Sequence, residues 1–498
     1  MKKVGFTLIL LALLLTACEV TPTVDLTPPT ATTQPTATLT PSPTPTPTAP
    51  STPTAIPTPP PLAVPAEVTA WLTANAVPFD SPLPGRGCDD LRPLLDMVGD
   101  ARIVALGEAT HGTSEFFTMK HRILECLVQE KGFNILALEA TDPDLVYLNA
   151  YLQTGEGDME TALGRLLNFW TLNTDEFFDM LAWLHTHNQN PGQTLKVSLR
   201  GFDVTSGHMA LQILLDYMEW VDPHNLEQVQ EDVDCLRRGM TNPQNYAAWT
   251  TENQLRCQQS IEDVHALLLN QRSAYQTASS PLAYAEAVEA ARILQQYEEL
   301  LRTDYQDSTA TFNLRDRFMA ENVAWLLEQA GPEAKIVLWA HNGHVQTSTL
   351  SRPNLEDIAS LPPETAPTLL PMGVHLREWF GDELVVIGFS FQSGSFNAMG
   401  MDLTNGFTGR MEHTARAPLP DSHEAYLYPE GLARYYLDLR TIPLEGEIAD
   451  WFQEPRWFRF IGNEYLEDYG EYMVQSLKLP NAFDVIVCLR DTTPSRGR

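Results

Sequence analysis

The sequence predicts an α/β fold with a mostly parallel central sheet, and three observations support this class. Short apolar runs alternate with long segments of helical periodicity along most of the chain. The runs are almost continuously apolar, as expected for parallel strands that are covered on both faces. Hydrophobic residues make up 43% of the 498-residue chain, which is enough to build a large core.

The first 66 residues are predicted to lie outside this fold. Residues 1–17 carry two lysines and then an apolar run too short to span a bilayer, which is typical of a secretion signal. Leu15–Cys18 resembles a bacterial lipobox, so we expect a lipid on Cys18; an ordinary signal peptide with an incidental cysteine is the alternative. Residues 18–66 are rich in Pro and Thr, as in a disordered spacer. The sequence thus predicts an exported protein, lipid-anchored to the outer face of a bacterial cell membrane.

The remaining part, residues 67–498, is expected to form one folded body, and it is acidic. Asp and Glu outnumber Lys and Arg by 64 to 32 in the whole chain, a net charge of −32. Nucleic acids and anionic membrane surfaces are bound through clustered basic residues. The charge therefore argues against both as partners of this body.

Five cysteines fall in the predicted folded part, and this odd number leaves at least one unpaired. Cys235 and Cys257 flank one polar stretch, which predicts a disulfide in an exported chain; two free thiols are the alternative. Cys126 and Cys488 lie in apolar runs and are predicted to be core thiols.

The predicted elements follow in chain order. A helix over about 116–130 ends at the C-cap signal of Lys131 and Gly132, and it joins the first two strands in a βαβ unit. Residues 208–331 contain long helical patterns and no good strand, so we expect a helical insertion that forms a cleft wall or lid. The predicted strands are Arg102–Leu106, Asn134–Leu138, Leu195–Arg200, Lys335–Trp339, Leu384–Phe389 and Phe483–Cys488.

Acidic residues and histidines follow these strands, where parallel sheets bind their ligands. Each of them alone has an ordinary explanation, such as a helix cap or a buried imidazole. Their coincidence predicts a functional site. In strand order the residues are Glu108 and His111, then Glu139, then Asp203, then His341 and His344.

Two helices add cations to this predicted site. Lys120 falls within the apolar arc of its helix, so it needs a carboxylate such as Glu108 or an anionic substrate group, unless it snorkels to the surface. Arg315 borders the inner face of a helix over 312–330, and Asp316 lies inside that face. Such a neighbouring pair is more often structural than substrate-binding. We predict Lys120, Asp203, His341 and Arg315 as the substrate-binding set.

Taken together, these motifs resemble those of the erythromycin esterase family. The resemblance implies a three-layer α/β/α body with a deep cleft, and metal-independent opening of erythromycin-like macrolactones. It also implies that His111 is the general base, assisted by Glu108, Glu139 and His344. A lipid anchor and a Pro/Thr spacer are not part of the family pattern. The resemblance extends over about 67–490 and is carried by Val104–Phe116, Lys120, Gly132–Glu139, Arg315–Asn322, Trp339–His344, Tyr436–Arg440 and Phe483–Asp484.

Elementary chemistry agrees with hydrolysis of an ester. Histidine suits the deprotonation of water near neutral pH, and Glu108 is close enough in sequence to orient His111. Candidate oxyanion donors are His344, Lys120 and backbone amides near Gly112. The sequence has no Gly-x-Ser-x-Gly motif, which disfavours a serine nucleophile.

We therefore predict a hydrolase in which water attacks an ester or macrolactone with no metal and no cofactor, and for which macrolide inactivation is one role. One alternative is a zinc- or manganese-dependent hydrolase of the same fold, since three histidines and three acids are metal-ligand types. Another is a non-catalytic, surface-anchored binding lipoprotein. The sequence specifies neither the substrate nor the oligomeric state.

Overall fold

The computed structural model describes residues 63–164, 170–303, 307–351, 368–402 and 406–498. The expected signal peptide, Cys18 and nearly all of the expected spacer lie outside these residues. The first helix, α1 (Ala66–Asn75), begins where the spacer is expected to end. In the part of the chain that is described, no helix is both long and apolar enough to cross a membrane.

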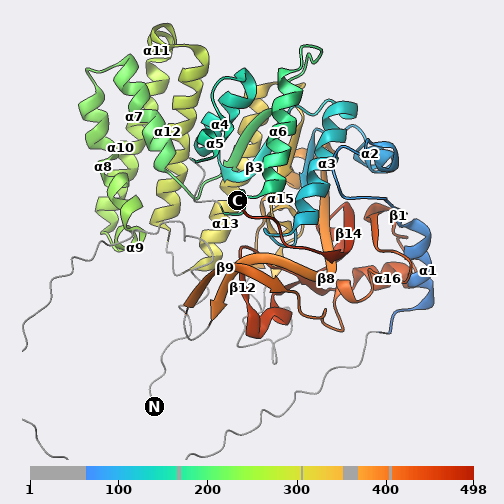
Figure 1. Cartoon of the computed structure of the whole chain (residues 1–498). Coiled ribbons are helices and arrows are strands. Elements are labelled where there is room, and N and C mark those ends of the chain that lie inside the picture. Colours follow the sequence, from blue (N-terminus) through green and yellow to red (C-terminus); the bar gives the residue numbers. More distant parts are fainter. Residues whose placement is uncertain (1–62, 165–169, 304–306, 352–367, 403–405) are drawn as a thin grey trace, which may run out of the picture.

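A ten-stranded sheet lies at the centre of the fold (Figure 1), with the path β1-β10-β14-β8-β2-β5-β3-β4. Six neighbouring strands of this path are parallel, and they correspond to the six predicted strands. At one edge β10 (Arg434–Asp438) and β1 (Val77–Pro78) run antiparallel. The parallel strands are β14 (Val485–Thr492), β8 (Leu384–Asp402), β2 (Ile103–Leu106), β5 (Ile336–Trp339), β3 (Ile135–Thr141) and β4 (Ser198–Asp203).

Helices cover both faces of this sheet, because successive side chains of each strand point to opposite faces. On β2, Val104 and Leu106 belong to one core, and Ile103 and Ala105 belong to the other. The fold is therefore a three-layer α/β/α arrangement. The first core includes α2 (Arg92–Val98), α3 (Ser114–Lys131), α4 (Asp142–Thr154) and α6 (Asp175–Gln189); the second includes α1, α13 (Ser308–Ala330), α15 (Met372–Phe380) and α16 (Glu447–Gln453).

A helical bundle between β4 and α13 has a hydrophobic core of its own. The segment expected as one insertion over 208–331 thus has two parts, because α13 packs on the sheet through Met319 and Val323 and reaches the bundle core through Phe318 and the partly buried Leu314. The bundle helices are α7 (His208–Val221), α8 (Leu226–Thr241), α9 (Pro243–Ala247), α10 (Thr251–Asn270), α11 (Arg272–Ala278) and α12 (Pro281–Arg302).

Several short strands were not predicted from the sequence. The far half of β8 pairs with β9 (Gly406–Thr414) and with β12 (Glu464–Leu466). A second, antiparallel sheet has the order β11-β13-β6-β7. Its strands are β11 (Arg456–Arg459), β13 (Val474–Leu477), β6 (Leu350–Ser351) and β7 (Thr368–Leu369).

The cysteines differ from expectation at one position. Cys235 and Cys257 form the expected disulfide between α8 and α10, and Cys488 is buried and unpaired as expected. The prediction of a free core thiol at Cys126 is wrong, because Cys126 is bonded to Cys88. Cys126 is buried, as its apolar run indicated. An apolar run does not distinguish a free thiol from a disulfide, because both are compatible with a buried position.

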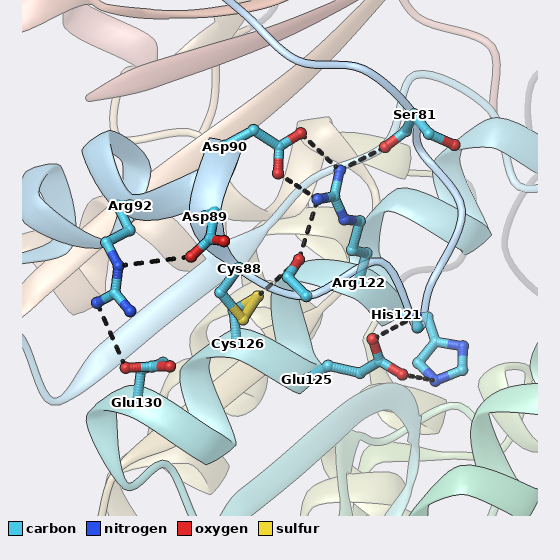
Figure 2. The surroundings of a disulfide bond; sticks show 12 residues. Ser81, Cys88, Asp89, Asp90, Arg92, His121, Arg122, Glu125, Cys126 and Glu130 are labelled. Carbon is cyan, nitrogen blue, oxygen red and sulfur yellow. Dashed lines mark hydrogen bonds and ion pairs between the residues drawn. A yellow bond between two sulfur atoms is a disulfide. The ribbon is translucent and has the colours of Figure 1, made fainter.

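This disulfide ties α3 to the segment that precedes α2 (Figure 2). Next to it, the fully buried Arg122 of α3 makes an ion pair with Asp90 and donates hydrogen bonds to the backbone carbonyls of Ser81 and Gly87. The helix that follows the His111 loop is therefore held by a covalent bond and by an ion pair.

Candidate active site

The predicted polar residues meet at the carboxyl ends of four neighbouring strands and on two helices, one of which is α3 with Lys120. The order β2-β5-β3-β4 brings together side chains that are more than 200 residues apart in sequence. The loop after β2 provides Glu108 and His111, and the turn after β5 provides His341 and His344; β3 carries Glu139, β4 ends with Asp203, and α13 carries Arg315 and Asp316.

The first network links His111, Glu108 and Lys120. Nδ1 of His111 lies 2.6 Å from Oε1 of Glu108, and Nζ of Lys120 lies 2.5 Å from Oε2 of the same carboxylate. Lys120 is fully buried, and its ammonium group lies 4.4 Å from the ring centroid of Trp339. The inward lysine predicted from the helical periodicity is therefore the partner of Glu108.

The charges in this network shift two pKa values. Burial lowers the pKa of Lys120 to about 8, although its attraction to Glu108 opposes the shift. Burial alone would raise the pKa of Glu108, but Lys120, followed by His111, outweighs it, so that this pKa lies below its usual value. Glu108 is thus held as a carboxylate against the imidazole of His111.

The ring of His111 is the most accessible part of this network. Its side chain is 17% exposed, compared with 4% for that of Glu108 and none for Lys120. Within the described residues, no hydrogen bond engages Nε2 of this ring. One imidazole nitrogen is therefore oriented by a carboxylate, and the other is left for a ligand.

The second network surrounds His344 with two carboxylates. Nδ1 of His344 lies 2.8 Å from Oδ1 of Asp316, and Nε2 lies 3.3 Å from Oε1 of Glu139. Burial opposes protonation, but Asp316 and then Glu139 outweigh it and raise the pKa of His344 to about 10. His344 is thus an imidazolium at neutral pH. The ring of Phe312 stacks against it at 5.4 Å.

Arg315 links Asp203 on β4 to the second network. Its guanidinium makes a bidentate pair with Asp203, with Nε–Oδ1 at 2.9 Å and Nη2–Oδ2 at 2.7 Å. Nη2 also donates to Oε1 of Glu139 at 3.1 Å. Arg315 therefore pairs with residues on β4 and β3, while its neighbour Asp316 pairs with His344.

His341 is engaged by the protein backbone. Its Nε2 donates to the carbonyl of Ile461 at 3.1 Å, and its Nδ1 accepts from the N–H of Gly343 at 3.1 Å. Burial, assisted by the charge of His111, lowers the pKa of His341 to about 3, so the ring is neutral. Its backbone N–H donates to Oε2 of Glu139 at 2.9 Å. Like Lys120, Asp203 and Arg315, this residue of the predicted substrate-binding set is buried and paired inside the protein.

One candidate oxyanion donor is already used. The N–H of Gly112 donates to Oγ1 of Thr110 at 3.3 Å. The ammonium of Lys120 is likewise occupied by Glu108 and, at 3.4 Å, by the carbonyl of Ala340. Both nitrogens of His344 face carboxylates as well, so His344 offers a positive charge and not a free N–H donor.

Sequence reasoning missed one ionisable residue of this region. Asp144 lies in the first turn of α4 and is partly buried. Burial, with repulsion from Asp203 and Asp142, raises its pKa to about 7. Its position five residues after Glu139, at the start of the helix that follows β3, was the available signal.

The histidines and acids thus pair with one another. No group of three or more His, Cys, Asp or Glu side chains in the described ranges is arranged to hold a metal ion. The arrangement can accept a proton at His111 and can stabilise negative charge close to His344.

The fold and this site define a hydrolase of the erythromycin esterase type. The model of that family, described as erythromycin esterase, matches residues 128–492. The chain therefore belongs to the erythromycin esterase family. The match begins after the first network, so Glu108, His111 and Lys120 precede the matched range.

Individual relatives agree with this assignment. Erythromycin esterase type II of Escherichia coli is 22% identical over 396 residues, which cover 75% of this chain and 89% of that protein. The putative hydrolase YbfO of Bacillus subtilis is 24% identical over 441 residues, which cover 85% and 91%.

Solved structures share the fold. A Bacillus cereus protein is 29% identical with a TM-score of 0.72, covering 87% of this chain and 98% of its own. A mutant of the erythromycin esterase EreC in its open conformation is 21% identical with a TM-score of 0.60, covering 82% and 94%. At this identity the second likeness shows the fold alone.

Proposed function

We propose that this protein hydrolyses a carboxylic ester or lactone by direct attack of water, with His111 as the general base. The observation that carries the proposal is the geometry of His111. Glu108 holds its Nδ1 at 2.6 Å, while its Nε2 has no hydrogen-bond partner in the described part of the chain and its ring is partly exposed. A base must be oriented and must also reach its substrate, and His111 meets both requirements.

The proposed reaction has two steps. In the first, Nε2 of His111 takes a proton from water as the water oxygen attacks the carbonyl carbon, and the carbonyl π electrons move to oxygen. In the second, the tetrahedral oxyanion collapses, the bond to the alkoxy oxygen breaks, and the imidazolium returns its proton to that leaving group. Glu108 stabilises the imidazolium between the two steps, and the cation of His344 stabilises the oxyanion. The reaction as proposed uses no metal and no cofactor.

The substrate we propose is a small ester, with macrolide lactones as the first candidates. Two of the curated relatives are erythromycin esterases of types II and I, and the second is 26% identical over 307 residues. Macrolide inactivation is therefore part of the proposal.

The test compares the wild-type protein with His111→Ala on macrolides and on simple esters, in metal-free buffer, with products read by mass spectrometry. We expect the addition of one water to the substrate and a kcat roughly 10²–10⁴-fold lower in the variant at an unchanged melting temperature. His208→Ala, at the exposed start of α7, is the control. Residual activity within about tenfold of wild type in His111→Ala would reject His111 as the base. Turnover that requires added Zn²⁺ or Mn²⁺ would support the metal-dependent alternative, and binding without turnover would support a binding protein.

The proposal extends to location: an exported protein whose lipid is attached to Cys18. The disulfides Cys88–Cys126 and Cys235–Cys257 support it, because disulfides persist mainly outside the cytoplasm. Labelling cells with a fatty acid should mark the wild-type protein and not Cys18→Ala. Equal labelling of the two would contradict lipidation at this cysteine.

A further inference from the structure

The segment Thr493–Arg498, which follows β14, lies along the start of two helices. Backbone bridges join Pro494 to Thr113, just before α3, and Gly497 to Thr174, just before α6. We refer to Thr493–Arg498 as the strap. Thr113 is two residues after His111, so the strap borders the loop that carries the proposed base.

The closest contact of the strap with this loop is at Gly112, the residue after His111. The carbonyl of Gly112 accepts two hydrogen bonds, one from the N–H of Ser495 at 2.8 Å and one from the N–H of Asn397 at 3.0 Å. The side chain of Asn397 in turn donates to the carbonyl of Ser495 at 2.6 Å. A Cβ atom at position 112 would lie 2.0 Å from the carbonyl oxygen of Asn397, so glycine permits this close approach.

Two carboxylates in the first turns of α3 and α6 fix the strap on these helices. Glu115 accepts from the N–H and the hydroxyl of Thr493, at 2.7 and 2.8 Å. Glu176 accepts from the N–H and from Nε of Arg496, both at 3.1 Å, and from the hydroxyl of Ser114 at 2.7 Å. Glu176 is 2% exposed, so this junction between α3, α6 and the strap is inside the protein.

Both partners of this contact lie outside the match to the family model. The match covers 128–492, whereas the His111 loop precedes it and the strap follows it. The assignment of the family therefore says nothing about the contact.

We propose that the strap positions His111 for catalysis through the N–H of Ser495, which holds the carbonyl of Gly112. Loops are the most mobile part of a scaffold, and a base displaced by about 1 Å loses about 10² in rate. A carbonyl held by two N–H groups restricts the peptide that follows His111. Ser495 and Asn397 are positioning residues, because they act on the proposed base through Gly112. The kinetic part of this proposal rests on the proposed esterase function.

A matched pair of variants isolates the hydrogen bond. Ser495→Pro removes the backbone N–H, while Ser495→Ala keeps it; within the described protein the buried hydroxyl of Ser495 makes no hydrogen bond. In Ser495→Pro we expect kcat to fall about ten- to hundredfold with KM within about twofold of wild type. In Ser495→Ala both constants should stay within about twofold. Equal kcat values in the two variants would overturn the proposal.

Rescue by a peptide separates positioning from a general loss of folding. A variant that lacks 493–498 should regain part of its kcat when the hexapeptide of that sequence is added at millimolar concentration. The same peptide with proline in place of Ser495 should not restore activity. Rescue by both peptides, or by neither, counts against the proposal.

Hydrogen exchange provides a readout that does not need a substrate. Amides of 110–114 should exchange faster in Ser495→Pro than in Ser495→Ala, while those of the bundle α7–α12 stay unchanged. If the wild-type protein hydrolysed no ester but showed this difference, the proposed function would fail and the structural role of the strap would stand. Unchanged exchange at 110–114 would overturn the proposal that the strap restrains this loop.

Discussion

The two histidine networks of the site use the same side chain in opposite ways. The protein occupies one nitrogen of His111 and leaves the ring 17% exposed. It surrounds both nitrogens of His344 with carboxylates and leaves 9% of the side chain exposed. Two carboxylates hold His344 as a fixed cation, whereas the single carboxylate on His111 leaves its Nε2 without a hydrogen bond in the described residues, as the base we propose requires.

The difference arises from what competes for each carboxylate. Lys120 takes one oxygen of Glu108, so this carboxylate is shared between a lysine and His111. Both oxygens of Asp316 lie within 3.0 Å of Nδ1 of His344. His111 thus has one carboxylate, which it shares with Lys120, whereas His344 shares Glu139 with Arg315 and has Asp316 in addition.

The largest expected effect comes from breaking the first network at Glu108. In Glu108→Gln, His111 loses the carboxylate that orients it, and kcat should fall roughly 10²–10⁴-fold. Lys120 would be left buried without a charged partner, which should lower the free energy of unfolding by about 3–5 kcal/mol. Steady-state kinetics and urea unfolding measure the two effects.

The double variant Glu108→Gln/Lys120→Met separates the effect on kcat from the effect on stability. Removing the unpaired cation should restore most of the stability and none of the activity. Recovery of kcat together with stability would show that Glu108 acts by folding the site and not by orienting His111.

A smaller effect is expected from Asp316→Asn, which makes the second network more like the first. Losing this carboxylate lowers the pKa of His344 and weakens the stabilisation of the oxyanion, so kcat should fall about 10²-fold. The alkaline limb of the pH–kcat profile, expected near pH 10 in the wild type, should move to lower pH. An alkaline limb at the same pH in both proteins would exclude His344 as its source.

The smallest effect concerns stability and pH in the wild type. The pKa of His344 is raised to about 10 in the folded protein, above its value of about 6.5 in an unfolded chain. Its stabilising contribution is therefore complete below about pH 6.5, declines as pH rises, and is lost above pH 10. The pKa of Lys120 is lowered to about 8, so this residue has the opposite trend above pH 8.

Urea unfolding between pH 6.5 and 8 isolates the histidine contribution when Asp316→Asn is the reference, because Asp144, with a pKa raised to about 7, titrates in both proteins. The free energy of unfolding should decline more steeply in the wild type than in Asp316→Asn over this interval. Parallel declines would mean that His344 is not held as a cation by Asp316.

Much of the fold could be predicted because the parallel strands are buried on both faces. Five of the six contain an apolar run, whereas the edge strand β4 mixes polar and apolar residues. The acids and histidines of the site follow β2 and β5 or lie near the ends of β3 and β4. The far half of β8 was missed because the sequence from Gln392 to Ser395 is polar and contains Gly394, which is typical of a loop. That half is formed by pairing with β9, β12 and β14, and this information is not local.

The members of the site were easier to predict than their partners. Arg315 and Asp316 suggested a pair by their adjacency, but consecutive residues on a helix point about 100° apart and do not face each other. Each therefore reaches a different part of the second network: Arg315 pairs with Glu139, and Asp316 pairs with His344. Cys126 shows the same limit, since its partner Cys88 lies 38 positions away and nothing in the local pattern identifies it.

The ion pair between Asp203 and Arg315 has a consequence for how this fold can diverge. Asp203 is the last residue of β4, and Arg315 is in α13. The two lie 112 positions apart in sequence, and the segment between them includes the whole bundle α7–α12. The pair holds the two ends of this segment beside the sheet, and the bundle has its own core. We therefore expect that the bundle can be replaced as a unit. Its length and shape can change through insertion or replacement while the ends, and the charged residues beside them, stay in place.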